Sequence, residues 1–175
     1  MRRKRAVVLG LLALLLMLGT SATVSAGPRP QAAVRAPVVD VQGAIEATHR
    51  WALGYDQRDI AMMRDAFTDD ARFVFHLSTG GDPLVFEGID EVMELFTSSL
   101  ESQDDVRRHV TTNHIVERLG PRRVRVTSYL TLLVIDDPTQ PPRLQSSGVY
   151  TDTIVHERDG VWRIQERILR LDTPS

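Results

Sequence analysis

The sequence predicts a single α+β domain in which helices pack on one face of a curved antiparallel sheet. In residues 41–67 and 89–100, most apolar residues recur every three or four positions, as in amphipathic helices. From residue 107 onward, apolar residues alternate with polar ones, as in strands. Helices followed by long strands within roughly 130 residues are typical of the α+β class.

Three segments are expected to be helical. The first covers residues 41–55, with Asp40 as its N-cap. The second is shorter, follows Asp59 as its cap, and includes residues 60–67. The third has an apolar side made of Ile89, Val92, Met93, Phe96 and Leu100.

Strands are expected wherever the alternation has a period of two. The turns Gly120-Pro121 and Arg158-Asp159-Gly160 each join two of them, and the second is a strong hairpin signal. Residues 136–145, which contain three prolines, are expected to form a loop over the mouth of a pocket. The expected strands are 71–77, 84–86, 107–119, 122–135, 147–156 and 161–171.

Two of these strands carry polar residues on a face that should point inward. In 122–135 the inward face is aliphatic except for Ser128, a hydroxyl that costs about 1 to 3 kcal/mol if it is buried without a partner. In 107–119 the alternation places His109 and Asn113 on one face, which is either the lining of a polar cavity or an exposed sheet face. The same alternation places His114 on the opposite face.

The cysteine and histidine content limits which kinds of catalytic and metal site the protein can contain. Cysteine is absent, which excludes thiol catalysis, thiolate metal sites and disulfides. The five histidines show no shared chelating geometry in the pattern, so we expect no metal and no other cofactor.

The first 26 residues have the pattern of a secretory signal peptide. Basic residues at 2–5 precede an apolar run over 6–18, and Val24-Ser25-Ala26 is a small-x-small cleavage pattern. The run is shorter than the roughly 20 residues of a membrane-spanning helix, although an uncleaved anchor is the alternative. We expect a secreted protein with a linker over 27–37, one domain over 38–172, and no stable membrane anchor after cleavage.

Removal of this segment would change the charge balance. It contains four of the 21 basic residues and no acidic ones, which leaves 17 basic against 23 acidic residues, a net charge of −6. A negative charge argues against nucleic acid and anionic membranes as partners.

Short segments in a fixed order carry a family resemblance. They are Gly54 to Asp59, Phe67 to Ala71, Arg108-His109 with Thr112-Asn113, Gly148 to Asp152, and Asp159 to Ile164 with Glu166-Arg167. Together they resemble the SnoaL-like proteins of the nuclear-transport-factor-2-like superfamily, and within it the scytalone dehydratase branch. The resemblance covers about residues 41–171 and implies a cone: a strongly bent sheet wrapped around helices and enclosing one pocket.

The resemblance also implies a catalytic set. Scytalone dehydratase is similar in its Tyr-Asp pair at the end of the first helix, which corresponds to Tyr55 and Asp56, and in one pocket histidine, which corresponds to His109. Its relatives often form homodimers, and the outer sheet face around Tyr129 could support one here.

Three other pocket positions differ from that enzyme. Its second histidine corresponds to Ser128, a second tyrosine to Phe75, and the pocket asparagine to Thr151. Ketosteroid isomerases, a related family, place their general-base aspartate where this chain has Phe75, which argues against their mechanism. Cyclisation and epoxide opening, which other members perform, remain open.

We therefore expect cofactor-free acid/base chemistry on a small, largely apolar or polyketide-like molecule: dehydration, cyclisation or isomerisation. His109 would be the base, since histidine ordinarily titrates near pH 6.5, with Asp56 orienting it and Tyr55 polarising a substrate oxygen. The residues expected to bind substrate are Phe75, Asn113, Ser128, Tyr150 and Thr151.

The alternative is an exported binding module for a small apolar or aromatic ligand. In that case Asp56 ties the second helix and His109 is a buried polar residue with its hydrogen bonds satisfied. The two hypotheses differ in whether Asp56 and His109 meet inside one pocket.

Overall fold

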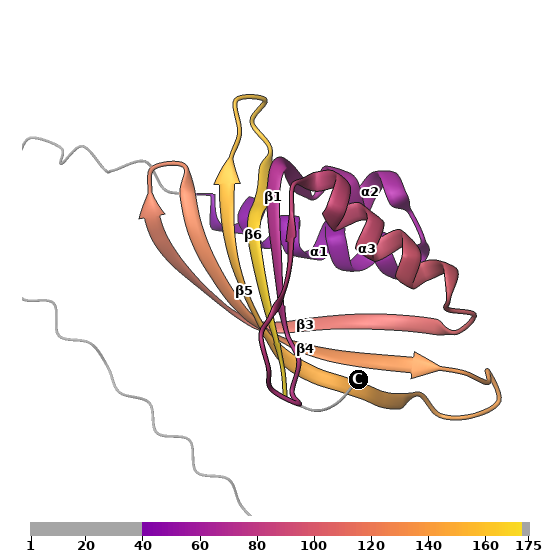
Figure 1. Ribbon diagram of the computed structural model, residues 1–175. Helices are drawn as coiled ribbons and strands as arrows, with labels where there is room; N and C mark the ends of the chain where they lie inside the picture. Colours follow the sequence, from indigo (N-terminus) through magenta and orange to yellow (C-terminus); the bar gives the residue numbers. More distant parts are fainter. Residues whose placement is uncertain (1–39, 173–175) are drawn as a thin grey trace, which may run out of the picture. The chain divides into compact units, whose positions relative to one another are not determined.

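A computed structural model describes residues 40–172, which form a bent six-stranded sheet with three helices inside the bend (Figure 1). The expected signal peptide (1–26) and linker (27–37) lie outside the described residues. The helices are α1 (Val41–Gln57), α2 (Ile60–Asp65) and α3 (Ile89–Glu101). The strands are β1 (Phe67–His76), β2 (Leu84–Glu87), β3 (Val106–Gly120), β4 (Arg123–Ile135), β5 (Arg143–His156) and β6 (Trp162–Leu171).

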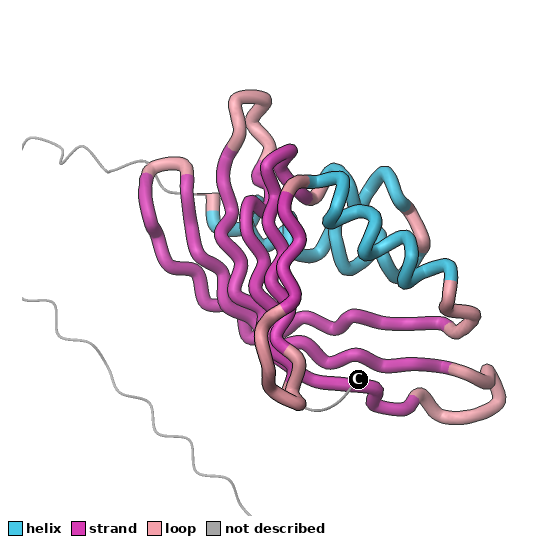
Figure 2. The backbone as a smooth tube through the Cα atoms, viewed as in Figure 1, coloured by secondary structure: helices cyan, strands magenta, loops and turns pink. Residues whose placement is uncertain are grey.

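The sheet has the order β2-β1-β6-β5-β4-β3. Neighbouring strands are antiparallel except for β1 and β6, which run parallel. These two strands are far apart in sequence, so their pairing joins the two ends of the domain. Figure 2 shows the tight turns at the ends of the long strands and the cyan helices gathered on one side of the sheet. The α+β class and the bent sheet expected from the sequence are thus confirmed.

Both predicted helix caps are present. The Asp40 carboxylate accepts the backbone N–H of Gly43 at 3.0 Å, and the Asp59 carboxylate accepts that of Met62 at 2.9 Å. Each bond satisfies an N–H group that has no partner within the first turn of its helix. Arg58 ends α1 in the left-handed conformation, with φ of 57°, and turns the chain into α2.

Two boundaries differ from the sequence prediction. Phe67 begins β1 instead of ending a helix, because it pairs with Ile164 of β6 and is fully buried. Similarly, β5 starts at Arg143, within the predicted loop, because Arg143 and Leu144 pair with β4. Strand pairing between distant segments overrides the local pattern in both places.

A bulge in β3 changes the face that its residues present. The register with β4 shifts between Thr112 and Ile115, and Asn113 adopts φ of 58°. An extra residue of this kind reverses the in-and-out alternation that follows it. His114 consequently points toward α1, where its ring lies 5.1 Å from that of His49, so the prediction that His109 and His114 face opposite sides is wrong.

The core lies between the helices and the inner sheet face. Its aromatic members contact one another: the Trp51 and Phe96 rings are 5.6 Å apart, and those of Phe67 and Phe96 are 5.8 Å apart. None of the helices in residues 40–172 is long and apolar enough to cross a membrane.

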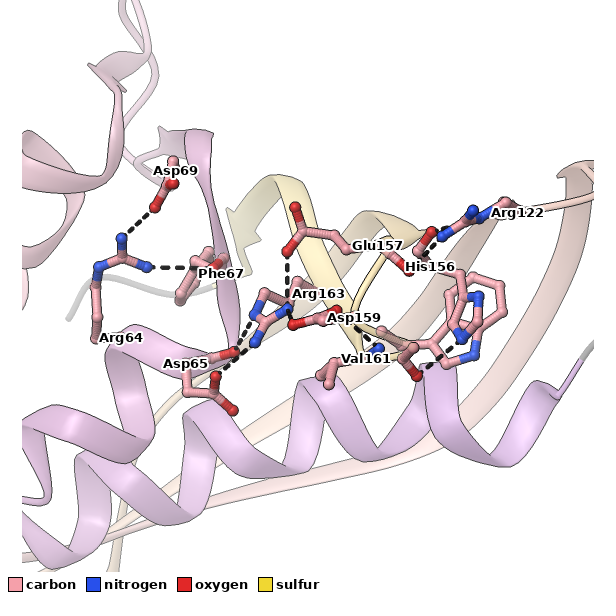
Figure 3. A network of polar contacts seen from close by, with 12 residues as sticks. Arg64, Asp65, Phe67, Asp69, Arg122, His156, Glu157, Asp159, Val161 and Arg163 are labelled. Atoms are coloured by element: carbon pink, nitrogen blue, oxygen red, sulfur yellow. Dashed lines mark hydrogen bonds and ion pairs between the residues drawn. The ribbon is translucent and has the colours of Figure 1, made fainter.

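A polar network joins the end of α2 to the β5–β6 hairpin (Figure 3). The Arg163 guanidinium donates to Asp65 at 2.8 Å, Glu157 at 2.8 Å and Asp159 at 2.7 Å. The Arg163 side chain is only 15% exposed, whereas the Asp65 carboxylate is 52% exposed, so these bonds lie at the surface of the domain. The hairpin is thereby tied to α2 at this end of the domain.

Candidate active site

A cavity of about 240 Å³ lies between α1, α3 and the inner sheet face. Its volume is somewhat below the range of roughly 300 to 1,000 Å³ that is usual for ligand pockets, and an apolar wall with few polar groups is typical of such sites. The apolar wall consists of Trp51, Phe73, Phe75, Leu95, Phe96, Leu130, Leu132, Leu169 and Leu171. The residues with polar groups are Tyr55, Ser99, Gln103, Arg107, His109, Ser146 and Tyr150.

Asp56 holds His109, which lines this cavity, while Asp56 itself is not part of the cavity wall. The Asp56 Oδ1 atom lies 2.7 Å from His109 Nδ1, and Asp56 Oδ2 accepts the backbone N–H of His109 at 2.9 Å. Both side chains are 8% exposed. The last turn of α1 supplies the carboxylate and the beginning of β3 supplies the imidazole, so the packing of α1 on β3 creates the pair.

The contacts assign the tautomer of the imidazole. A carboxylate only accepts hydrogen bonds, so in the neutral imidazole of His109 the proton is on Nδ1 and Nε2 presents a lone pair. Nε2 has no hydrogen-bond partner among the described residues, and it is not one of the polar atoms sealed from solvent. Because His109 lines the cavity, this lone pair is available to a bound molecule.

Tyr55 stands beside the histidine with its hydroxyl held by Gln103. The two rings are 4.9 Å apart with an angle of 68° between their planes, and the Gln103 amide nitrogen donates to the phenol oxygen at 3.0 Å. The phenol oxygen also lies 3.3 Å from the Gln103 Oε1 atom, which can accept the phenol proton, so a ligand oxygen would take this hydrogen bond in place of Gln103. Gln103 follows α3 and carried no sequence signal beyond lying in a solvated run.

Arg107 contributes a cation to the lining. Its Nε and Nη2 atoms donate to the two carboxylate oxygens of Asp105 at 2.8 and 2.9 Å. The hydrogen bonds to Asp105 raise the pKa of Arg107, which remains charged. This ion pair sits at the start of β3, two residues before the catalytic candidate His109.

A buried ion pair lies behind the aromatic wall. Arg167 donates to both oxygens of Asp152, at 2.8 and 2.7 Å, and both side chains are fully buried. The guanidinium carbon is 4.3 Å from the centre of the Trp51 ring and 4.4 Å from that of Tyr150, within cation–π range.

Sequence reasoning missed this ion pair. Counting back from the hairpin pair Ile154 and Ile164 would place Asp152 opposite Glu166. A bulge beside Thr153 shifts the register by one, so that Asp152 pairs with Arg167 instead.

The five residues expected to bind substrate separate into two groups. Phe75 and Tyr150 line the cavity. Ser128 is 1% exposed, as expected for the inward face, but it is not part of the cavity wall, and its hydroxyl has no partner among residues 40–172.

Asn113 and Thr151 lie elsewhere. Asn113 is exposed at the bulge of β3, which takes its side chain off the inner face. Thr151 pairs with Thr127, and its neighbours along β5, Tyr150 and Asp152, are the residues that point inward. The structure therefore does not place either residue in the site.

His114 has an unusual environment near the Arg167–Asp152 pair. Burial lowers its pKa below 6.5, and the nearby His49 lowers it further, while Asp152 opposes the change. Its Nε2 atom is sealed without a partner among the described residues. Within residues 40–172, no group of three or more histidine, aspartate or glutamate side chains is arranged to hold a metal ion.

Comparison with known proteins identifies the family. The model of the SnoaL-like domain matches residues 37–168, and the chain therefore belongs to the SnoaL-like family. A search of curated protein sequences finds no significant match.

Solved structures share the fold. ActVI-ORFA from Streptomyces coelicolor has a TM-score of 0.64 at 18% identity, covering 75% of this chain and 96% of that one. Aln2 from a Streptomyces species has a TM-score of 0.63 at 20% identity, covering 78% and 93%. A provisionally assigned scytalone dehydratase from Novosphingobium aromaticivorans has a TM-score of 0.61 at 18% identity, covering 77% and 85%. The bent sheet around helices is thus the architecture of this family.

Proposed function

We propose that this protein is a cofactor-free acid/base enzyme that dehydrates, cyclises or isomerises a small, largely apolar molecule. The observation that carries the proposal is the contact between Asp56 and His109 at the wall of the apolar cavity. A histidine whose Nδ1 is bonded to a buried carboxylate, and whose Nε2 faces a cavity, has the arrangement of a general base.

Each group has a defined part in the proton transfer. His109 Nε2 takes a proton from the substrate, and the Asp56 carboxylate stabilises the imidazolium that forms. Tyr55 donates its phenol proton as a hydrogen bond to a substrate oxygen, while Gln103 holds the phenol in place. Positioned proton transfer of this kind contributes about 10² to 10⁴ in rate.

The cavity limits the substrate. A volume of about 240 Å³ equals about eight water volumes, which corresponds to roughly ten non-hydrogen atoms inside the domain. The wall of Phe73, Phe75, Phe96 and Trp51 suits a flat ring. We therefore infer a substrate with one or two rings, and the fold shared with the provisionally assigned scytalone dehydratase supports dehydration as one candidate reaction.

The test is a screen of one- and two-ring phenols, ketones and alcohols, with binding followed by thermal shift and products by mass spectrometry. It uses the wild type, Asp56→Asn and His109→Ala. Asp104→Asn is the matched control, because it makes the same change as Asp56→Asn at an exposed carboxylate close to His109 in sequence. Asp104 forms no hydrogen bond or ion pair with another described residue.

We expect all four proteins to bind the substrate, and the wild type and Asp104→Asn to convert it at the same rate. Asp56→Asn and His109→Ala should convert it 10² to 10⁴ times more slowly, roughly the contribution of positioned proton transfer. Asp56→Asn should act through the tautomer, because an amide facing Nδ1 shifts the proton to Nε2 and removes the lone pair. If a compound binds all four proteins and none converts it, the protein is a ligand-binding module instead.

A further inference from the structure

Tyr150 is a buried tyrosine whose hydroxyl has no protein partner within residues 40–172. The residue is 1% exposed and lines the cavity, yet its hydroxyl forms no hydrogen bond with any residue in the described part of the chain. Some unpartnered polar atoms, such as Ser128 Oγ and His114 Nε2, are completely inaccessible, but the Tyr150 hydroxyl is not one of these inaccessible atoms. The hydroxyl therefore opens into the cavity.

The Tyr150 ring is held on two sides. The Trp51 ring stands edge-on to it at 5.7 Å, and the Arg167 guanidinium lies 4.4 Å from its centre. Asp152 fixes that guanidinium by two hydrogen bonds. Such packing leaves the phenol little freedom to turn away from the cavity, so a ligand would meet it already oriented.

Tyr150 and His109 both line the same small cavity, and both rings contact Trp51. The Trp51 ring is 5.1 Å from the His109 ring and 5.7 Å from the Tyr150 ring. A ring-sized ligand in contact with Trp51 can therefore reach both polar groups.

The phenol stays protonated at ordinary pH. Burial raises the pKa of Tyr150 well above its usual value near 10, against the opposing effect of the Arg167 charge. The negative groups nearby, Asp152 and Asp56, raise this pKa further. A phenol kept neutral in an apolar wall is a hydrogen-bond donor.

We propose that the Tyr150 hydroxyl binds a carbonyl oxygen of the substrate, which makes this a site for one- or two-ring ketones. The inference deepens the proposed function and rests on it for the role of His109. When His109 takes a proton from the carbon next to the carbonyl, the electron pair of that C–H bond moves onto the oxygen. The hydrogen bond from Tyr150 strengthens as this charge develops, and the phenol keeps its proton.

The test compares two ligands of almost equal shape on three proteins. The ligands are 1-tetralone, a two-ring ketone, and tetralin, the same skeleton without the oxygen. The proteins are the wild type, Tyr150→Phe, and the control Tyr129→Phe, whose exposed side chain lies on the outer sheet face. Removing an unpartnered hydroxyl should leave the fold intact, which urea unfolding verifies.

We expect Tyr150→Phe to bind 1-tetralone about 3 to 10 times more weakly than the wild type and tetralin equally well, the size of one hydrogen bond. Tyr129→Phe should match the wild type with both ligands. The carbonyl stretch of bound 1-tetralone should lie at lower wavenumber in the wild type than in Tyr150→Phe.

Equal affinity of the wild type and Tyr150→Phe for 1-tetralone, including no measurable binding by either, overturns the proposal. This outcome is independent of turnover. A protein that converts no compound but discriminates the ketone through Tyr150 would refute the enzymatic function and retain the oxygen-binding role of Tyr150.

Discussion

Asp56 holds His109 through two atoms at once, one on the imidazole and one on the backbone. Oδ1 lies 2.7 Å from Nδ1, while Oδ2 accepts the backbone N–H at 2.9 Å. The carboxylate therefore fixes both the ring and the strand that carries it. It has a structural role and a chemical role in the same place.

The two roles of Asp56 can be separated by stability. Asp56→Ala leaves the backbone N–H of His109 without its acceptor, and we expect a loss of about 1 to 3 kcal/mol of unfolding free energy in urea. Asp56→Asn keeps a carbonyl oxygen for that N–H and should lose less than Asp56→Ala. Equal losses in both variants would show that the backbone contact contributes nothing.

The bulge in β3 depends on the conformation of Asn113. Its φ of 58° lies in the left-handed region, which glycine adopts freely and β-branched residues strongly disfavour. Asn113→Gly should leave stability unchanged or raise it slightly, whereas Asn113→Val should lower it by about 1 to 2 kcal/mol. Urea midpoints of the two variants provide the measurement, and the reverse order would contradict the bulge.

Gly148 marks a place where β5 and β6 approach too closely for a side chain. A Cβ atom there would lie 2.4 Å from the carbonyl oxygen of Arg170, a backbone atom that cannot move alone. We expect Gly148→Ala to cost about 1 to 3 kcal/mol. Gly120→Ala is the control, since a Cβ at Gly120 meets nothing within 4 Å, and the two variants should differ clearly in thermal unfolding.

Stability should depend on pH through His114. Burial and His49 lower its pKa in the folded state, so the unfolded chain binds its proton first as the pH falls below about 6.5. The fold therefore loses stability progressively as the pH falls from about 6.5 to the lower folded pKa of His114, and the loss persists below that pKa. His114→Gln should lose less stability than the wild type between about pH 7.5 and 5.5, and an NMR titration of the His114 ring should show the lowered pKa. A ring that titrates at or above about 6.5 would contradict this prediction.

The ion pair of Asp152 and Arg167 should be costly to break from one side. Arg167→Met leaves a fully buried carboxylate without its partner, and the expected loss is about 3 to 5 kcal/mol. Replacing both residues, as Asp152→Leu with Arg167→Met, removes the uncompensated charge and should recover part of that loss. Denaturant unfolding of the single and double variants measures the difference.

By itself, the sequence determined the helices, the strands and the two hairpins that join the long strands in pairs. The apolar spacing in residues 41–55 and 89–100 specifies helices, Asp40 and Asp59 specify where helices begin, and alternation specifies the long strands. These signals are local: each depends on residues within one or two turns or on two adjacent strands. The family resemblance then placed Tyr55, Asp56 and His109 in one site, and the structure brings the three together.

Only the tertiary structure decided which polar side chains share the interior. The bulge at Asn113 turned His114 inward, and the bulge beside Thr153 paired Asp152 with Arg167. One extra residue in a strand exchanges its two faces, and the strand's own pattern does not reveal where that residue will be accommodated. The choice is made by the packing of α1 and the neighbouring strands, which is why the sequence predicted the bent sheet but placed Asn113 and Thr151 in the cavity wall, where the structure does not have them.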